Sequence, residues 1–319
     1  MTAYIIRRIL WGIALLVLVC ALTFLLFRIL PTGNPAVLRA GRDPQPKLIH
    51  EIERVLGLNK SLPVQFWDYV KGVLFHFDLG YSYYSQQSVK SLIAERLPPT
   101  ISLAVGAGVL WVIGGLGVGI ISALRRHSLL DRGAMGAALV LVSTPEFWLG
   151  LIVLFLFSDG IGRWHIFPSA GSYVPLTQDP WGWFTSLILP WFVLAAGAAA
   201  VFARLMRGSL IEAMDEDYIR TARAKGLNER AVVRQGVRSS INPIVTLFGL
   251  EIGTLLGGAL LVEVVFNIPG VGLLAYHAII QADFSLIQGT VLLAAMFIIV
   301  ANIVVDIGYA YLDPRVRYS

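Results

Sequence analysis

The sequence has 319 residues, of which 56% are hydrophobic and only 14% are charged, and its mean hydropathy is +0.72. Because soluble domains carry roughly 25% charged residues, so few charges could not cover the surface of a soluble enzyme, and disorder would need a more polar chain. The net charge of +5 is better explained by basic loops beside an anionic membrane surface than by nucleic-acid binding.

Six apolar stretches are each long enough to cross the hydrocarbon core of a bilayer, which takes about 20 residues of helix. They cover residues 9–30, 101–124, 134–157, 187–206, 244–266 and 286–312. The third and fifth stretches are the least uniform, because Glu146, Glu251 and Glu263 fall at or inside their limits. The sequence therefore predicts an all-α polytopic membrane protein with about six transmembrane helices.

The first apolar stretch follows Arg7-Arg8, as the core of a signal peptide would. It is longer than the 7–15 residues of such a core, and no small-x-small cleavage site follows it. We expect residues 1–30 to remain as the first transmembrane helix. Residues 31–98 then form an extracytoplasmic loop, and residues 99–319 form a five-helix core that contains a cytoplasmic loop at 208–242.

The long outer loop is expected to be structured. Residues 46–56 have the apolar spacing of an amphipathic helix, with Gly57 placed to end it, and a second short helix is predicted from Pro63. The loop could shield the ends of the membrane helices or serve as a docking surface for a partner. The sequence favours neither role over the other.

The distribution of lysine and arginine predicts the orientation in the membrane. If the N-terminus is cytoplasmic, 15 of the 25 basic residues lie on inner segments, and nine of the other ten lie at or in the long first loop. Loops longer than about 60 residues escape the positive-inside rule. Both termini are therefore expected in the cytoplasm.

The inner loop at 208–242 carries helix boundary signals at both ends of a short segment. Acidic residues at 215–217 precede residues 218–225, and Gly226 follows them, while Asn228 can cap a second helix over 229–238. Ala222 and Gly226 stand four residues apart, which predicts a small face that a partner could approach closely. A loop that only touches lipid headgroups is the alternative, but paired caps and small residues favour protein docking.

Residues 218–227, with Ile241-Asn242-Pro243 downstream, resemble the "EAA" coupling motif of ABC importer permeases. More narrowly, the chain resembles the first permease of the peptide/nickel (dipeptide and oligopeptide) subfamily. The stretches that carry this resemblance are 78–82 (DLGYS), 93–100 (IAERLPPT), 144–150 (TPEFWLG), 269–272 (PGVG) and 313–318 (DPRVRY). One departure is Thr221, where the name of the motif implies glutamate.

This resemblance implies the type I ABC importer fold and a bacterial inner-membrane location. It implies a second permease as heterodimeric partner, two ATPase subunits that bind ATP and magnesium, and an extracytoplasmic solute-binding protein. The ATPase-coupling residues would be Tyr218, Thr221, Ala222, Ala224, Lys225, Gly226 and Leu227. The cargo would be dipeptides, oligopeptides or a similar small solute.

No catalytic role or bound cofactor is expected for this chain. It has no G-x-x-x-x-G-K-[ST] loop for ATP, its single cysteine is Cys20, and its five histidines are scattered, so no metal site is predicted.

Carboxylates at membrane depth are costly and suggest function. Glu146 or Glu251 could line the substrate pathway, although either could instead make a buried interhelical hydrogen bond or mark a helix end. An ion-coupled secondary transporter that uses such carboxylates is the alternative function. The docking loop argues against it, because a secondary carrier needs no cytoplasmic ATPase.

Overall fold

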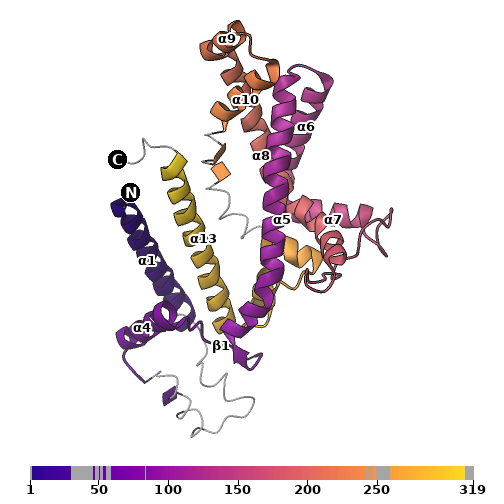
Figure 1. The fold of residues 1–319 in the computed structure, drawn as a ribbon. Coiled ribbons are helices and arrows are strands. Elements are labelled where there is room, and N and C mark those ends of the chain that lie inside the picture. Colours follow the sequence, from indigo (N-terminus) through magenta and orange to yellow (C-terminus); the bar gives the residue numbers. More distant parts are fainter. Residues whose placement is uncertain are drawn as a thin grey trace. The chain divides into compact units, whose positions relative to one another are not determined.

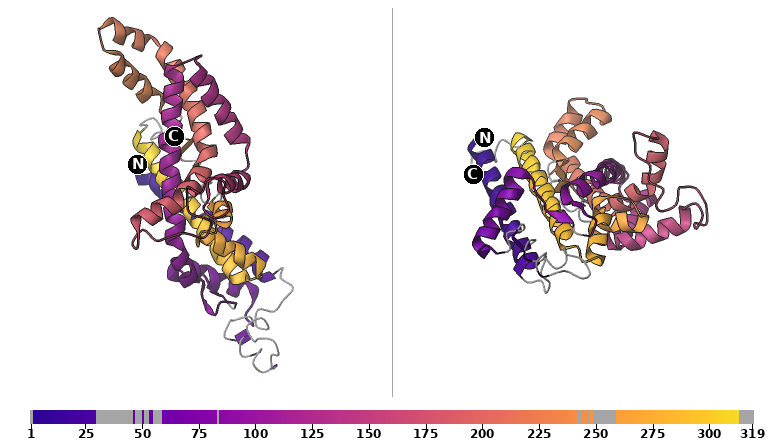
Figure 2. Two further views of the ribbon diagram at one scale, coloured as in Figure 1. Left: turned by 90° about the vertical axis from the view of Figure 1, so that its right-hand side faces the viewer. Right: turned by 90° about the horizontal axis from the view of Figure 1, so that it is seen from below.

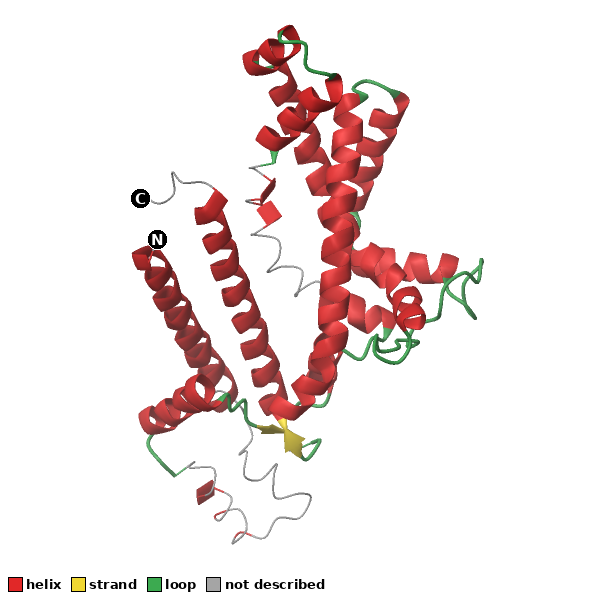
Figure 3. Ribbon diagram, in the orientation of Figure 1, coloured by secondary structure: helices red, strands yellow, loops and turns green. Residues whose placement is uncertain are grey.

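The computed structural model describes residues 2–29, 46, 50, 53–54, 59–82, 84–241, 244–245, 247–248 and 259–312. The chain divides into two compact units, one of residues 1–97 with 274–303 and the other of residues 98–273 with 304–319. The described part is predominantly helical, with one two-stranded hairpin among the described residues (Figure 3).

The first unit contains the N-terminal helix, the described end of the outer loop and most of the last helix (Figure 1). Its elements are α1 (Thr2–Phe24) continued by η1 (Leu25–Ile29), α4 (Leu62–Lys71) continued by η2 (Gly72–His76), β1 (Tyr81–Ser82) and β2 (Gln87–Ser88). It also includes the beginning of α5 (Val89–Leu124), the end of α12 (Val271–Ile280) and most of α13 (Phe284–Leu312).

Helix α4 confirms the short helix predicted from Pro63, which lies in its first turn. The ring of Phe24 on α1 packs against Phe66 at a centroid distance of 5.5 Å and against Tyr69 at 6.0 Å. The hydroxyls of Thr23 and Tyr69 lie 3.3 Å apart. The helix predicted over 46–56 lies largely outside the described residues.

The motif at 78–82 forms the joint between the hairpin and α13. Ser82 on β1 hydrogen-bonds the carboxylate of Asp283, and both residues are buried. The other carboxylate oxygen of Asp283 accepts a hydrogen bond of 3.2 Å from the backbone N–H of Leu286, so Asp283 also caps α13. A side chain on Gly289 would collide with Val89, so α5 begins in close contact with α13.

The second unit is built around a long helix, α8 (Pro180–Asp215). Around it lie the rest of α5, α6 (Leu129–Ser143), α7 (Glu146–Phe157), α9 (Asp217–Ala224) and α10 (Glu229–Ser240). Helices α5, α6 and α8 run side by side in two views (Figures 1 and 2). Glycines permit this approach, because a Cβ atom on Gly119 would lie 2.7 Å from the carbonyl oxygen of Ala203.

Four helical segments are long and apolar enough to cross a membrane: Ile5–Phe27, Val89–Leu124, Pro180–Asp215 and Phe284–Val305. Two further pairs qualify only if each is taken as one bent span, which brings the number to as many as six. This agrees with the predicted polytopic all-α fold of about six spans.

The third predicted span is not one continuous helix. Helices α6 and α7 are bent by 113° at Thr144 and Pro145. Proline disfavours helical geometry in the preceding residue, and Thr144 is indeed extended (φ −92°, ψ 125°). The predicted span over 134–157 is therefore a bent pair of helices and not one continuous helix.

The end of the fifth predicted span is followed by a helix that the sequence did not predict. The helical residues Ala259–Phe266 and α12 are bent by 79°. Asn267, which follows Phe266, has a positive φ of 50° and turns the chain.

Candidate coupling site

Helix α9 continues the chain almost directly from the end of α8. Only Glu216 separates the two helices, in an extended conformation (φ −72°, ψ 151°). Its N–H donates to the carbonyl oxygen of Ala213 at 3.3 Å, and its own carbonyl accepts from Ile219 at 3.1 Å. The corner is therefore hydrogen-bonded on both sides, and the predicted helix over residues 218–225 is confirmed as α9.

One face of α9 is buried against the chain itself. Ile219 and Ala222 form a small apolar cluster with Val232 of α10, and Met214 at the end of α8 packs on it. Ile219 and Val232 are fully buried. This cluster fixes the orientation of α9 relative to α8 and α10, because any rotation of α9 away from them would expose these apolar side chains to water.

A Schellman motif ends α9. The N–H of Gly226 donates to the carbonyl oxygen of Arg223 at 2.9 Å, and that of Leu227 donates to Ala222 at 3.3 Å. Gly226 has a φ of +77°, a value that residues with a side chain rarely adopt. A Cβ atom at this position would meet nothing within 4 Å, so the backbone angle and not local space requires glycine.

Helix α10 brings the chain back along α8. As predicted, Asn228 caps it, with its side-chain oxygen accepting from the N–H of Ala231 at 2.8 Å. Near its end the hydroxyl of Ser240 donates to the carbonyl oxygen of Ser209 on α8 at 3.1 Å. Gly236 faces Met214 so closely that a Cβ atom there would lie 2.8 Å from its sulfur.

Two polar contacts tie α9 to α10. The hydroxyls of Tyr218 and Ser239 are 2.5 Å apart, and the Nε of Arg223 donates to Glu229 at 3.0 Å. The end of α8, α9 and α10 therefore form one supported unit, which we call the coupling hairpin (residues 208–241). Asn242 and Pro243, which belong to the downstream part of the motif resemblance, lie outside the described residues.

The structure separates the predicted coupling residues by exposure. Tyr218 and Leu227 are 37% and 43% exposed, and the other exposed members of the set are Thr221, Ala224, Lys225 and Gly226. Ala222 is instead 6% exposed and faces α10 and α8. Ala222 and Gly226 thus do not share one exposed small face, because the chain leaves its helical path at Gly226.

A buried ion pair holds the membrane end of the coupling hairpin. Arg207 on α8 binds Asp131 on α6 through two hydrogen bonds, of 2.6 Å from Nε and 2.8 Å from Nη2. The carboxylate also accepts from the Ser122 hydroxyl on α5 and from the backbone N–H of His127 at 2.9 Å. Asp131 therefore joins α5, α6 and α8 at one point.

No expectation drawn from the sequence included this ion pair. The spacing Ser128-x-x-Asp131 is a signal for a helix start, and Ser128 does accept a hydrogen bond from the N–H of Asp131. The pattern locates the beginning of α6 but says nothing about the arginine 76 residues later.

The structure describes only one of the two acidic residues that were proposed to line the substrate pathway. Glu146 is the first residue of α7 and is half-buried there, whereas Glu251 lies outside the described residues. Neither location tests a role in transport, which stays a prediction. Among the described residues, no group of three or more His, Cys, Asp or Glu side chains could hold a metal ion.

Glu263 makes the kind of buried interhelical contact considered as an alternative for these carboxylates. It is fully buried and accepts hydrogen bonds from the hydroxyl of Thr100 at 2.6 Å and from the N–H of Leu273 at 3.0 Å. A side chain on Gly270 would collide with this carboxylate. Glu263 therefore anchors the beginning of α12 to α5.

The chain matches two described protein families. Residues 115–318 match the binding-protein-dependent transport system inner membrane component, and residues 1–104 match the N-terminal part of such membrane components. A protein of Brucella abortus (strain 2308) named as a peptide transport system permease is 42% identical over all of both chains. Glutathione transport system permeases of Pectobacterium atrosepticum and Salmonella typhimurium are 41% and 39% identical, again over the full length of both.

Proposed function

The chain belongs to the binding-protein-dependent transport system inner membrane components, the permeases of ABC importers, and we propose that it carries short peptides or a similar small solute. Its relatives named for peptide and glutathione transport support this cargo, since glutathione is itself a small peptide. The family membership confirms the importer function expected from the motifs and leaves the ion-coupled secondary transporter without support.

We infer that the working transporter contains four further subunits. A second, similar permease completes the pathway as a heterodimeric partner, two ATPase subunits bind ATP and magnesium in the cytoplasm, and a solute-binding protein delivers cargo from outside. The permease itself is non-catalytic. Its amino-terminal and carboxyl-terminal ends lie in the cytoplasm, as the distribution of basic residues indicates.

The coupling hairpin is the observation that carries the proposal. A helix that transmits a push must be stiff and firmly attached, because a flexible loop would absorb the displacement. Helix α9 meets both conditions through its buried Ile219 and Ala222 and its close connection to α8. We propose that Tyr218, Lys225 and Leu227 contact an ATPase subunit, while Ala222 supports them from within.

Movement of the ATPases during their nucleotide cycle then shifts α8 through this hairpin. In an alternating-access mechanism the shift biases the permease pair between inward-open and outward-open states. Glu146 and Glu251 are proposed to line the pathway, where a carboxylate could bind the amino terminus of a peptide. A Glu251→Ala variant that transports normally, with unchanged substrate preference, would exclude Glu251 from the pathway.

Site-specific cross-linking tests the coupling assignment. In a Cys20→Ser background, which removes the only cysteine, single cysteines are placed at Lys225 or Leu227 in the assembled transporter. We expect both to cross-link to an ATPase subunit. Two further single-cysteine variants serve as controls. One has its cysteine at the buried Ala222, and the other at the exposed Gln87 on β2.

Cross-linking from Gln87 equal to that from Leu227, or no cross-linking from either Lys225 or Leu227, would contradict the assignment. Transport is measured in parallel with labelled peptides in vesicles that contain the complete transporter. Peptide uptake that continues with inactivated ATPases would contradict the importer mechanism.

A further inference from the structure

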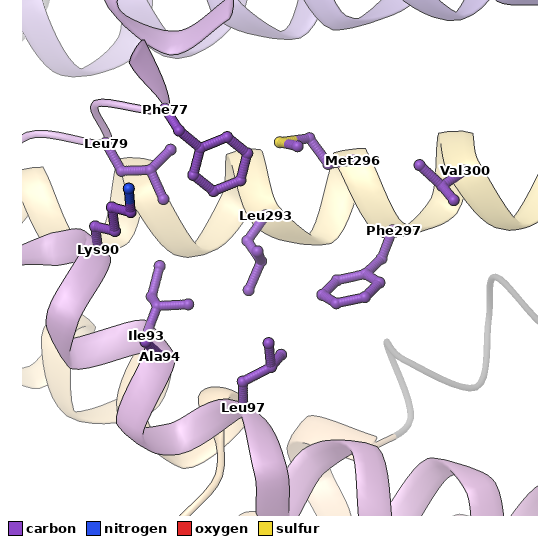
Figure 4. A pocket seen from close by; sticks show the side chains of 10 residues that line it. All are labelled: Phe77, Leu79, Lys90, Ile93, Ala94, Leu97, Leu293, Met296, Phe297 and Val300. Carbon is purple, nitrogen blue, oxygen red and sulfur yellow. The ribbon is translucent and has the colours of Figure 1, made fainter.

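An apolar cavity of about 300 Å³ lies within the first unit, between the beginning of α5 and α13 (Figure 4). Leu293, Met296, Phe297 and Val300 form the α13 side. These residues follow the i, i+3, i+4, i+7 spacing of a single helix face, so the wall extends about 10 Å along α13 at 1.5 Å per residue. This wall belongs to the membrane-spanning segment Phe284–Val305.

The opposite wall comes from α5, through Ile93, Ala94 and Leu97. All three are apolar, and Ile93 is only 4% exposed. A peptide would lose hydrogen bonds to water on entering such a cavity and would find no side-chain partner along these walls. The chemistry of the walls therefore fits a hydrocarbon chain.

One end of the cavity is charged. Lys90, Phe77 and Leu79 lie at this end, and Val300 lies at the other (Figure 4). The ammonium of Lys90 is 5.8 Å from the centroid of the Phe77 ring and makes no ion pair within the described part of the chain. Val300 is 55% exposed, so that end opens to the surface of the unit.

If the candidate span Phe284–Val305 crosses the bilayer, the two ends of the cavity lie at different depths. Val89 packs against Gly289, five residues into α13, which puts Lys90 about 8 Å from the start of that helix. A lysine at this depth can extend its amine to the headgroup region. Leu293 to Val300 lie farther along the span, at the level of the acyl chains.

We propose that this cavity binds one anionic phospholipid of the surrounding bilayer, with an acyl chain against α13 and the headgroup phosphate at Lys90. The lipid fills a space that these described residues line with hydrocarbon. Because the proposal depends on membrane insertion and on these residues alone, it is independent of the transported solute.

Photolabelling of the assembled transporter tests the proposal. The complex is reconstituted into phosphatidylcholine vesicles that contain a small fraction of phosphatidylglycerol with a photoreactive group on one acyl chain. A parallel sample contains the same fraction of phosphatidylcholine with the same group. Mass spectrometry then locates the labelled residues.

We expect label on the α13 and α5 walls, and more from phosphatidylglycerol than from phosphatidylcholine. Lys90→Gln should lower this preference about fivefold, the factor that corresponds to about 1 kcal/mol for one lysine at an anionic surface. Lys71→Gln is the matched control, since Lys71 is an exposed lysine of the same unit in the last turn of α4. Ala94→Phe should remove label from both lipids by filling the cavity.

Equal labelling by the two lipids, or a preference unchanged in Lys90→Gln, would overturn the proposal. So would absence of label from the intact complex together with cross-links from these walls to the second permease. If Ala94→Phe does not assemble, the comparison of Lys90→Gln with Lys71→Gln still decides the question.

Discussion

Thr100 and Glu263, 163 residues apart in the sequence, share a buried hydrogen bond of 2.6 Å. The Thr100 hydroxyl donates this bond and accepts another, of 2.8 Å, from the backbone N–H of Val271 at the beginning of α12. The glutamate accepts from Leu273 two residues later. One threonine and one glutamate thus satisfy two of the N–H groups that a helix leaves unpaired at its start.

Replacing Thr100 with valine should destabilise the protein by about 1–3 kcal/mol, because the N–H of Val271 and one oxygen of Glu263 lose their partner in a buried place. Thr100→Ser keeps the hydroxyl, so its unfolding midpoint should be close to that of the parent protein. Thermal unfolding of the purified protein, followed by size-exclusion chromatography after heating, compares the two variants. Equal midpoints for valine and serine would show that the hydroxyl contributes nothing.

Gly226→Ala should weaken the communication between substrate and ATPase. A residue with a Cβ atom pays roughly 1–2 kcal/mol in the left-handed conformation that Gly226 adopts, so the end of α9 should shift. Gly226→Asn should have a smaller effect, since asparagine tolerates this conformation better. Substrate-stimulated ATPase activity of the assembled transporter is the measurement, with the amount of inserted permease as control. Activity of the alanine variant at or above that of asparagine would contradict the conformational explanation.

Breaking the ion pair between Asp131 and Arg207 should destabilise the second unit. Removing one charge leaves the other without its partner at the point where α5, α6 and α8 meet, and the 25% exposure of the Arg207 side chain moderates the loss. Asp131→Asn and Arg207→Gln should each lower the unfolding midpoint, and the double variant should lose less than the sum. Strictly additive losses in this double-mutant cycle would mean that the two residues do not stabilise each other.

Ser82→Ala and Asp283→Ala should loosen the hairpin that precedes α5. Either change leaves a buried polar partner unsatisfied, at a cost of about 1–3 kcal/mol. Limited proteolysis of the outer side in sealed vesicles should cleave near residues 80–88 faster than in the parent. Ser61→Ala is the control, because Ser61 is exposed, makes no side-chain cap hydrogen bond and lies outside the hairpin. Equal cleavage of all variants would rule out a role of Asp283 in holding this hairpin.

Local signals in the sequence predicted local structure well. The cap at Asn228, the glycine at 226 and the proline at 63 each act within one turn of helix, so their effect can be inferred without knowledge of the fold. The four continuous candidate spans followed in the same way from long apolar runs. Even the break at Pro145 had a local cause that the sequence contains.

Long-range partners could not be predicted from these signals. Nothing near Asp131 indicates Arg207, and nothing near Glu263 indicates Thr100, because each pair depends on how separate helices pack. Ala222 shows the same limit in the candidate site. The spacing of Ala222 from Gly226 suggested an exposed surface for a partner. Ala222 is instead buried, because it packs against Val232 and Met214.

Pro190 lies within α8 and interrupts its ladder of backbone hydrogen bonds, which gives this helix one point at which it can bend. Proline cannot donate to the carbonyl of Ser186, so the helix can bend there without breaking a hydrogen bond. Asp215 lies 25 residues after Pro190, a length of about 38 Å at 1.5 Å per residue, and a tilt of about 10° would move this far end by about 6–7 Å. That displacement exceeds the pitch of a helical turn. A few degrees of bending at one buried proline could therefore supply the stroke at α9, with no helix unwound and no side chain of the coupling hairpin rearranged.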